Sequence, residues 1–522
     1  MRHTAILLIA LFALATGRAQ PEGMPPPDDT EAEMPAEGYP LYKFRVYLRD
    51  KKGTAYSVKH PEEFLSQKAI DRRRRQGLKV DRTDLPLSAP YVEAIRETGV
   101  EVCHGSKWNN TLLVQTSDTA LMEGIREMPF VTSVRLVATY ARPQRPDTTD
   151  RHALIATEEP VRPSSVTTTV NRLFDRLSAA DSTEGWIDSL AVAKAVLSRA
   201  LAEPLPTPHE APAYEDSLYG AGHEQIAQLG GLALHEAGYR GAGMTIAIVD
   251  GGFYNADIIP MLQGAHILGT ADFVEPGGDV YTAASHGMMV LSCIAANAPG
   301  QLIGTAPEAA FWLLRSEDTH SEQLVEEDNW AAAVEFADSV GADIINSSLG
   351  YTKFDAPAAT SLYRELDGHT HLSSHSASLL ARKGIVLCNS AGNAGDEPWK
   401  LIGSPADATD ILTVGAVDNQ GLNTYFSSVG PTADGRIKPD VMARGGRSAV
   451  LSIRGNVTRA NGTSFASPTL CGLVACYWQA NPTLSALQVV ENIRLLGDNA
   501  QHPDNIFGWG IPDFSQWNST SH

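Results

Sequence analysis

The spacing of hydrophobic positions divides the chain into two regions of different texture. In the first region, apolar and charged residues alternate strictly over residues 42–49, which predicts a half-buried strand. Helical and strand patterns follow it, with Asp118 as a candidate N-cap. The further predicted elements are helices over 61–76, 90–98 and 118–128, and strands over 110–116 and 131–137. We therefore predict a small α+β domain over residues 40–145.

From about residue 214 onward, short apolar runs alternate with segments of helical spacing. The runs expected to form buried strands cover residues 244–249, 309–314, 343–348, 384–389 and 411–417. This alternation is typical of βαβ units, which build a parallel sheet with helices on both faces. The predicted fold class is therefore an α/β domain with a doubly wound, mostly parallel sheet over residues 214–515, preceded by the small α+β domain.

Three segments outside these domains lack the pattern of a core. Residues 1–20 begin with basic Arg2 and continue as an apolar run, which predicts a secretory signal peptide. Residues 21–39 are rich in proline and acid, and we expect a disordered leader there. Residues 146–213 combine proline-rich ends with a helical pattern, which predicts a linker. The sequence has no other run of 18 apolar residues, so we expect a secreted or periplasmic protein without a transmembrane segment.

The charge is distributed unevenly between the two domains. Residues 1–145 hold 21 lysines and arginines against 18 acidic residues, whereas residues 146–522 hold 20 against 43. A strongly acidic second part argues against nucleic acid as a partner. We expect the basic run over residues 72–75 to be a solvated helix face. The five cysteines are odd in number and lie mostly in apolar surroundings, so we expect small buried hydrophobes rather than a disulfide framework.

Two polar residues stand at positions suited to proton transfer. Asp250 ends the apolar run MTIAIVD and precedes two glycines, and such strand ends are where open α/β sheets gather their functional groups. His286 begins a helix that is apolar nearly all round. Taken alone, the Asp-Gly pair also fits a simple turn, and the histidine also fits a helix cap or a satisfied core residue.

Ser464 lies in the stretch NGTSFASPTLCGLVACYW, where a polar hexapeptide leads into a very apolar helix pattern. A serine hydroxyl is a weak nucleophile and needs a nearby base and donors for the developing oxyanion. At a helix start its own N–H is free to serve as one donor. Gly462 lets the backbone turn, and we expect Pro468 to be tolerated as an early-turn residue. Asn393, in the loop after the run GIVLCN, is the candidate second donor, with a plain asparagine turn as the alternative.

The order Asp250, His286, Asn393, Ser464 on one α/β domain resembles that of the subtilisin-like serine proteases, over about residues 214–515. The matching stretches are GTSFASP, SHGMMV, NSAGNAG, NSSLG, ILTVGAVD, FSSVGP and KPDV. The resemblance implies a subtilisin-like fold and a serine endopeptidase with an Asp250/His286/Ser464 triad and Asn393 in the oxyanion hole. Gly251 stands where many members have serine or threonine, which affects substrate detail rather than catalysis. Arg444 likewise replaces a usual proline.

The resemblance also implies roles for other parts of the chain. Residues 40–145 are similar to a propeptide that chaperones folding and inhibits the enzyme until self-processing, with an independent binding domain as the alternative. Residues 146–213 are the candidate processing region. Peptide or protein substrates are expected to pair with two neutral walls, and large apolar residues to fit between them. These walls are Ser348, Leu349 and Gly350, and Ser390, Ala391 and Gly392. Tyr351, where relatives often have glycine, is expected to narrow the entrance.

Metal binding and other functions were weighed against this interpretation. His369, His371 and His375 near Asp367 have ligand chemistry, but they lie in a polar loop pattern, and we predict no metal there. Relatives often bind structural calcium, but no calcium loop is legible, and we predict no cofactor for catalysis. An inactive family member that binds peptides is the main rival. An α/β-hydrolase esterase is disfavoured, because Ser464 lacks the Gly-x-Ser-x-Gly elbow and comes last in the order.

Overall fold

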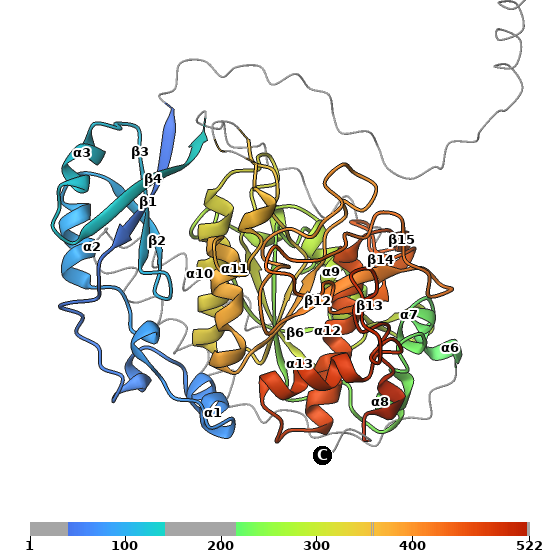
Figure 1. Cartoon of the computed structure of the whole chain (residues 1–522). Coiled ribbons are helices and arrows are strands. Elements are labelled where there is room, and N and C mark those ends of the chain that lie inside the picture. The colour runs from blue at the N-terminus through green and yellow to red at the C-terminus, as the bar shows by residue number, and fades with distance from the viewer. Residues whose placement is uncertain (1–39, 141–215, 356–357, 359, 519–522) are drawn as a thin grey trace, which may run out of the picture.

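The computed structural model describes residues 40–140, 216–355, 358 and 360–518 (Figure 1). The predicted signal peptide, the leader and the linker over 146–213 lie outside these residues. Within the described part of the chain, no helix is both long and apolar enough to cross a membrane.

The N-terminal domain is a four-stranded antiparallel sheet in the order β2-β3-β1-β4, with two helices on one face. Its elements are β1 (Leu41–Leu48), α1 (Gln67–Arg75), α2 (Ala89–Arg96), β2 (Glu101–Ser106), β3 (Thr111–Thr116), α3 (Leu121–Arg126) and β4 (Val131–Tyr140). Ile95 of α2 and Met122 of α3 pack with Val46 and Val114 of the sheet. These inward side chains are the apolar members of the alternating patterns, so the small α+β domain forms as its periodicity predicts.

Strand β2 was not expected from the sequence. Its short stretch EVCHGS contains a histidine and a glycine and shows no clear alternation. Gly105 is needed there, because a Cβ would come 2.5 Å from Leu87 Cδ1 and 3.1 Å from the Thr111 carbonyl oxygen. Helix α3 also begins later than predicted, and Asp118 accepts a bond from the Ala120 N–H (2.9 Å) in the turn ahead of it. Strand β2 therefore could not be predicted from its own residues, because it forms through its pairing with β3.

The second domain is built on a seven-stranded sheet in the order β13-β12-β11-β10-β5-β9-β6, and every neighbouring pair is parallel. Its strands are β5 (Thr245–Asp250), β6 (His266–Asp272), β9 (Ala310–Arg315), β10 (Ile344–Ser347), β11 (Val386–Ser390), β12 (Leu412–Val417) and β13 (Val441–Arg444). Two small ribbons accompany them: β7 (Asn297–Ala298) with β8 (Leu302–Ile303), and β14 (Ser448–Leu451) with β15 (Val457–Ala460).

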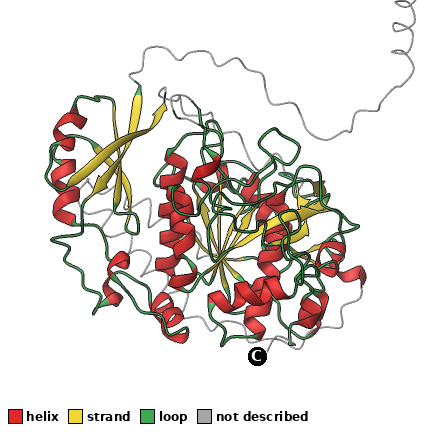
Figure 2. Ribbon diagram, in the orientation of Figure 1, coloured by secondary structure: helices red, strands yellow, loops and turns green. Residues whose placement is uncertain are grey.

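Helices cover both faces of this sheet (Figure 2). The helices are α6 (Asp216–Tyr219), α7 (His223–Ala227), α8 (Leu232–Glu236), α9 (His286–Ala295), α10 (Val325–Val340), α11 (Leu372–Leu379), α12 (Thr463–Ala480) and α13 (Ala486–Leu495). Within β5, Ile246 and Ile248 pack in the cluster of α9, α12 and α13, whereas Ala247 and Val249 pack in that of α10 and α11. Both faces are buried, which explains the continuous apolar runs. The predicted α/β fold class is confirmed.

The five predicted strands are present, but the two edge strands β6 and β13 were missed. Strand β6 carries polar residues and Gly269, where a Cβ would come 2.5 Å from Trp312 Cζ3 of β9. Strand β13 is only four residues long. Edge strands pair on one side, so their sequences carry a weaker signal than the buried centre of the sheet.

The N-terminal domain packs against α10 and α11 of the second domain (Figure 1). Here the expectation of a solvated arginine face over residues 72–75 is wrong for Arg72 and Arg73, which are 0% and 1% exposed. It holds for the other two arginines, whose side chains are 70% and 60% exposed. Both buried guanidinium groups bind Asp338 on α10, and Arg73 Nη2 lies 2.9 Å from Asp338 Oδ2 and 3.0 Å from Asp84 Oδ1. The partner Asp338 lies far along the chain, so the local charge run could not reveal this burial.

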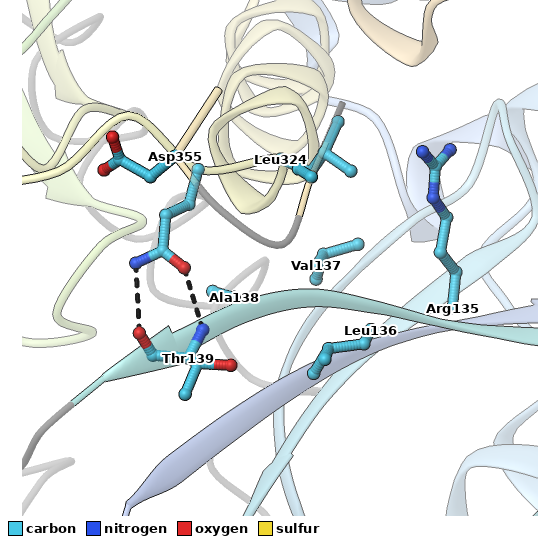
Figure 3. A pocket seen from close by; sticks show the side chains of 9 residues that line it. Arg135, Leu136, Val137, Ala138, Thr139, Leu324 and Asp355 are labelled. Carbon is cyan, nitrogen blue, oxygen red and sulfur yellow. Dashed lines mark hydrogen bonds between the residues drawn. The ribbon is translucent and has the colours of Figure 1, made fainter. Parts of the chain in front are cut away.

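A second set of polar contacts lies farther along the same interface. Arg45 of β1 donates two bonds of 2.7 Å to Asp328, and His104 Nε2 lies 2.9 Å from Asn329 Oδ1. At the end of β4, the amide of Gln323 is bonded to both backbone groups of Thr139 (2.8 and 3.3 Å), beside a cavity of 170 Å³ (Figure 3). The two domains therefore share a polar and largely buried interface.

The five cysteines are buried free thiols, as their apolar surroundings predicted. They are Cys103, Cys293, Cys388, Cys471 and Cys476.

Candidate active site

Asp250 and His286 are brought together at the centre of the parallel sheet. Asp250 ends β5, which lies between β10 and β9, and it is fully buried. His286 is the first residue of α9, and its Nδ1 lies 2.8 and 3.0 Å from the two carboxylate oxygens of Asp250. Gly287 permits this approach, because a Cβ there would come 2.9 Å from Asp250 Cβ and 2.5 Å from the Gly252 carbonyl oxygen. The pair is therefore held by the close packing of a helix start on a strand end.

The electrostatics of His286 favour its protonated form. Loss of water around the ring lowers its pKa, but the charge of Asp250, the bond to that carboxylate and the charge of Glu317 outweigh this effect. The net result is a pKa above the usual value. The His286 side chain is 37% exposed, so it is reachable from outside while its Nδ1 edge is anchored inside. This arrangement suits a group that takes and returns a proton.

Ser464 is the second residue of α12 and is 8% exposed. Gly462 is the N-cap that precedes the helix, and its φ of 151° favours glycine. Pro468 lies beyond the first turn, contrary to our expectation, and so leaves the carbonyl of Ser464 without its helical N–H donor. The hydroxyl of Ser348 fills this position, donating to the Ser464 carbonyl oxygen at 2.9 Å. The carbonyl group that the proline leaves free thus links the start of α12 by a hydrogen bond to the residue that follows β10.

The hydroxyl of Ser464 does not bond to the histidine in this structure. Its Oγ donates to the Ser348 carbonyl oxygen at 3.4 Å, and no bond joins it to His286 in the described part of the chain. The rings of His286 and Phe465 are 5.9 Å apart between centroids, so the histidine nevertheless lies beside the start of α12. Contacts of this kind are often long or unmade until a substrate binds.

Asn393 lies in the loop after β11 and is fixed beside Ser464. Its Oδ1 accepts bonds from the N–H (2.9 Å) and the hydroxyl (3.0 Å) of Thr463. The Gly392 N–H in turn donates to Thr463 Oγ1 at 3.2 Å. Because Oδ1 is occupied by these donors, the Nδ2 amine is the group that this side chain presents elsewhere. The asparagine is therefore more than an isolated turn residue.

The two predicted substrate walls lie side by side, because they follow the neighbouring strands β10 and β11. Asn389 joins them, since its Nδ2 donates to the carbonyl oxygens of Leu349 (3.2 Å) and Ser390 (2.8 Å). At Gly350 a Cβ would meet only the Ser404 carbonyl oxygen at 3.7 Å, so this part of the wall is open. Ala391 is 1% exposed and packs with Ile402 and Ala406 instead. The side chains of the two walls are therefore small or apolar, and none is charged.

Tyr351 does not narrow an entrance, because its side chain turns inward and is fully buried. Its hydroxyl donates to Glu317 Oε1, and its backbone pairs with Ser404 (2.7 and 3.1 Å). Burial raises the pKa of Glu317 to about 8, with the charges of Glu322 and Asp250 acting in the same direction. Sequence reasoning missed Glu317, although it follows β9, the neighbour of β5, and the rule that selected Asp250 applies to it equally.

Two of the three histidines that were considered as metal ligands form hydrogen bonds with other side chains of the protein. His371 Nδ1 lies 2.8 Å from Glu327 Oε1, and His375 Nδ1 lies 2.8 Å from Asn109 Oδ1 of the N-terminal domain. Asp367 accepts bonds from the N–H groups of His369 (2.8 Å) and Thr370 (2.7 Å). Across the described ranges, no group of three or more His, Cys, Asp or Glu residues has an arrangement that could hold a metal ion.

Comparison with known proteins gives two family matches. The profile described as "Subtilase family" (Peptidase S8) matches residues 241–510, and the profile described as "Peptidase S8 propeptide domain, Bacteroidota" matches residues 43–152. Together they cover the two domains of the structure.

Individual relatives agree with the profiles. Subtilisin NAT of Bacillus subtilis subsp. natto is 30% identical over 291 residues, which is 55% of this chain and 68% of that protein. Serine protease AprX of Bacillus subtilis (strain 168) is 30% identical over 304 residues, 52% of this chain and 65% of that protein. A solved structure titled "Structure of MycP3 protease from the type VII (ESX-3) secretion system" has 24% identity and a TM-score of 0.46, covering 60% of this chain and 94% of its own.

Proposed function

This chain belongs to the subtilase family of serine-type endopeptidases, and we propose that Ser464 is its nucleophile, His286 its general base and Asp250 the acid that orients the histidine. The observation that carries the proposal is the Asp250–His286 pair at 2.8 Å, facing the start of the helix that begins with Thr463 and Ser464. Each residue stands where its role requires it: a buried acid, a half-exposed base and a serine at a helix N-terminus.

The first half of the reaction forms an acyl-enzyme. The Asp250 carboxylate accepts a hydrogen bond from the Nδ1–H group of His286 without taking the proton, and so leaves Nε2 as the ring nitrogen that can accept a proton. The Ser464 hydroxyl leaves the Ser348 carbonyl by rotation about χ1 and turns toward Nε2. As its proton passes to His286, Oγ forms a bond to the peptide carbonyl carbon. The resulting oxyanion collapses, the C–N bond breaks, and His286 gives its proton to the leaving amine. A water molecule then repeats the sequence in place of Ser464 and releases the acid product.

The oxyanion is stabilised by two donors at the start of α12. One is the N–H of Ser464, which at a helix N-terminus has no intrahelical partner. The other is the Nδ2 amine of Asn393, oriented by the two bonds that its Oδ1 accepts from Thr463. These groups are fixed before the charge develops, which is what makes them effective. The chemistry needs only these side chains and water.

The substrate lies along the two neutral walls described above, adding a strand to the segment over residues 348–350. The side chain before the scissile bond lies between this segment and residues 390–392. Both segments carry small or apolar side chains, so large apolar residues such as phenylalanine, leucine or methionine fit there.

The N-terminal domain, with predicted bounds 40–145, acts as a propeptide that assists folding and blocks the enzyme. Support comes from the propeptide profile over residues 43–152 and from the buried ion pairs with α10. Cleavage by the chain itself within residues 146–213 then yields the active enzyme, after export directed by residues 1–20. An independent binding domain is the alternative for this part of the chain.

Labelling with a fluorophosphonate probe, together with hydrolysis of casein, tests the proposed chemistry. We expect the wild-type chain to be labelled and active, and Ser464→Ala to be neither. If a folded wild-type chain gives no label and no hydrolysis, the rival interpretation as an inactive, peptide-binding family member replaces the proposal.

A further inference from the structure

Glu317 lies against the backbone that follows the proposed triad acid. Arg315 pairs with Asp250 across β9 and β5, and the next N–H, of Ser316, donates to the Asp250 carbonyl oxygen at 3.0 Å. A Cβ added to Gly251 would lie 3.5 Å from Glu317 Cβ and 2.9 Å from Thr319 Cγ2. The glycine that departs from the family pattern therefore makes room for the turn that carries Glu317.

Another departure from the family pattern, Tyr351, leads to the same carboxyl group. Its buried hydroxyl donates to Glu317 Oε1, and its ring stacks on Phe354 at 6.3 Å. Tyr351 directly continues the wall over residues 348–350. Two residues that differ from the family pattern, 100 positions apart in the sequence, thus both contact the segment of Glu317. This suggests that the two differences serve one function beside the active site.

The direction along the wall fixes which part of a peptide this acid faces. Ser348 contacts Ser464, so the scissile bond lies at that end of the wall. Passing from Ser348 to Tyr351 leads away from the scissile bond, along the residues that precede it in the substrate. Glu317 is bound to Tyr351 and lies close enough to His286 to raise the pKa of that histidine, so in the proposed binding mode it is on the side of the substrate residues upstream of the scissile bond.

The charged groups around Glu317 are mostly acidic, apart from His286, whose charge lowers the pKa of Glu317. Its hydrogen-bond partner among the described side chains is a neutral phenol, and no salt bridge to lysine or arginine is formed there. Glu326, in the first turn of α10, is 1% exposed, and no lysine or arginine of the described residues pairs with its carboxyl group. Glu322 also lies close enough to raise the pKa of Glu317 by its charge. Buried carboxyl groups without a cation are unusual and are stabilised by one that arrives.

We infer that Glu317 selects a lysine or arginine side chain of the peptide substrate, at a position upstream of the residue directly before the scissile bond. This rests on the proposed function, since it needs Ser464 as the nucleophile. Tyr351 holds the carboxyl group in place through one oxygen, and the incoming ammonium or guanidinium group pairs with it beside the proposed triad. The substrate sequence is then selected at two positions. A neutral pocket accepts the residue directly before the scissile bond, and Glu317 accepts a basic residue that precedes it.

Matched peptides test this inference, cleaved by the enzyme that is purified after the full-length chain has been expressed and has released its N-terminal domain. Each peptide carries phenylalanine before the scissile bond and either lysine or methionine at one of the three preceding positions. Active serine is counted with the fluorophosphonate probe, so that every kcat/KM refers to functional sites. At one position, we expect lysine to exceed methionine by roughly ten- to a hundredfold, as for a hydrogen bond to a charged group.

Glu317→Gln is the informative variant, because glutamine keeps an acceptor for the Tyr351 hydroxyl and loses only the charge. We expect its lysine-to-methionine ratio to fall close to one. Glu322→Gln is the matched control, since it removes an acidic charge nearby from a side chain that does not bind Tyr351. It should keep most of the wild-type ratio.

The outcomes separate the two proposals. A wild-type ratio near one at all three positions, or an equal fall in both variants, overturns the inference while the peptidase function stands. In the second case the selection would come from the general negative field of the domain. A wild-type chain that is neither labelled nor active removes the proposed function, and the inference with it.

Discussion

Helix α10 carries buried carboxylates of two kinds. On the side facing the N-terminal domain, Asp328 and Asp338 form salt bridges with arginines of that domain, at distances of 2.5 to 2.9 Å. At its first turn, Glu326 forms no salt bridge within the described part of the chain, and nearby Glu317 is hydrogen-bonded to a phenol. Carboxylates that hold the two domains together are thus paired with arginines, whereas those beside the proposed active site have no lysine or arginine partner among the described residues.

This difference helps to explain why acidic residues are unevenly distributed between the two domains. Part of the acid in residues 146–522 lies at two places, an internal docking surface and a region beside the proposed catalytic groups. The arginines of the N-terminal domain are complementary to the first and leave the second unpaired. Docking and substrate selection therefore use separate acids, and substitutions can perturb one without the other.

The largest expected effect comes from removing the nucleophile. Ser464→Ala should lower kcat by about 10⁶-fold, the loss found when a subtilisin loses its serine. In a protease-free preparation it should also leave the N-terminal domain attached, because no self-cleavage takes place. Hydrolysis of casein and N-terminal sequencing measure both results. Normal maturation of this variant would contradict self-processing but not the nucleophile.

Asp338→Asn tests the docking side of the comparison. It leaves Arg72 and Arg73 buried without their shared charge, which typically costs 3–5 kcal/mol. In the Ser464→Ala background, where the domain stays attached, we expect the free energy of unfolding to fall by about that amount. Asp71→Asn is the control, because its pair with Arg74 is exposed and contributes little. Equal effects of the two substitutions in denaturant titrations would show that the buried pairs do not hold the domain.

Asn393→Ala tests the oxyanion donors. We expect kcat to fall roughly 10²–10³-fold with little change in KM, the range known for this kind of donor in a subtilisin. Steady-state kinetics on one neutral peptide are sufficient. A raised KM with an unchanged kcat would instead make Asn393 a residue that binds the substrate in its ground state.

Much of the fold was predictable because both faces of the central sheet are buried. Strands such as β5 and β10 therefore appear as continuous apolar runs, and Asp250 and His286 stand out as polar residues at their ends or at helix starts. The edge strands β6 and β13, and β2 with its glycine, lack that signal. Their existence depends on pairing partners that a local pattern does not contain.

The missed features of the site are all contacts between distant segments. The burial of Arg72 depends on Asp338 in the other domain, and the inward turn of Tyr351 depends on Glu317. The sequence shows Pro468 but not how far it lies from the start of the helix. Nor does the sequence show that the Ser348 hydroxyl donates to the Ser464 carbonyl group, which the proline leaves without its helical N–H donor. Residue types therefore identified the candidate groups, and only the fold revealed which of them are joined.

The smallest expected effect concerns the pH at which activity is lost. His286 must be neutral to act as a base, and the neighbouring Asp250 carboxylate raises its pKa against the lowering effect of burial. Activity should therefore disappear, as pH falls, with a midpoint above the usual histidine value of about 6.5. The acidic limb of kcat/KM on a neutral peptide reports this value for the free enzyme. Proton NMR of His286 in the Ser464→Ala chain gives it independently of activity, and Asp250→Asn should move it downward, because an amide cannot offset the desolvation of the ring. Since Asp250 is buried and Glu317 lies beside it, a midpoint unmoved by Asp250→Asn would mean that the second acid, rather than the first, sets the charge of the histidine.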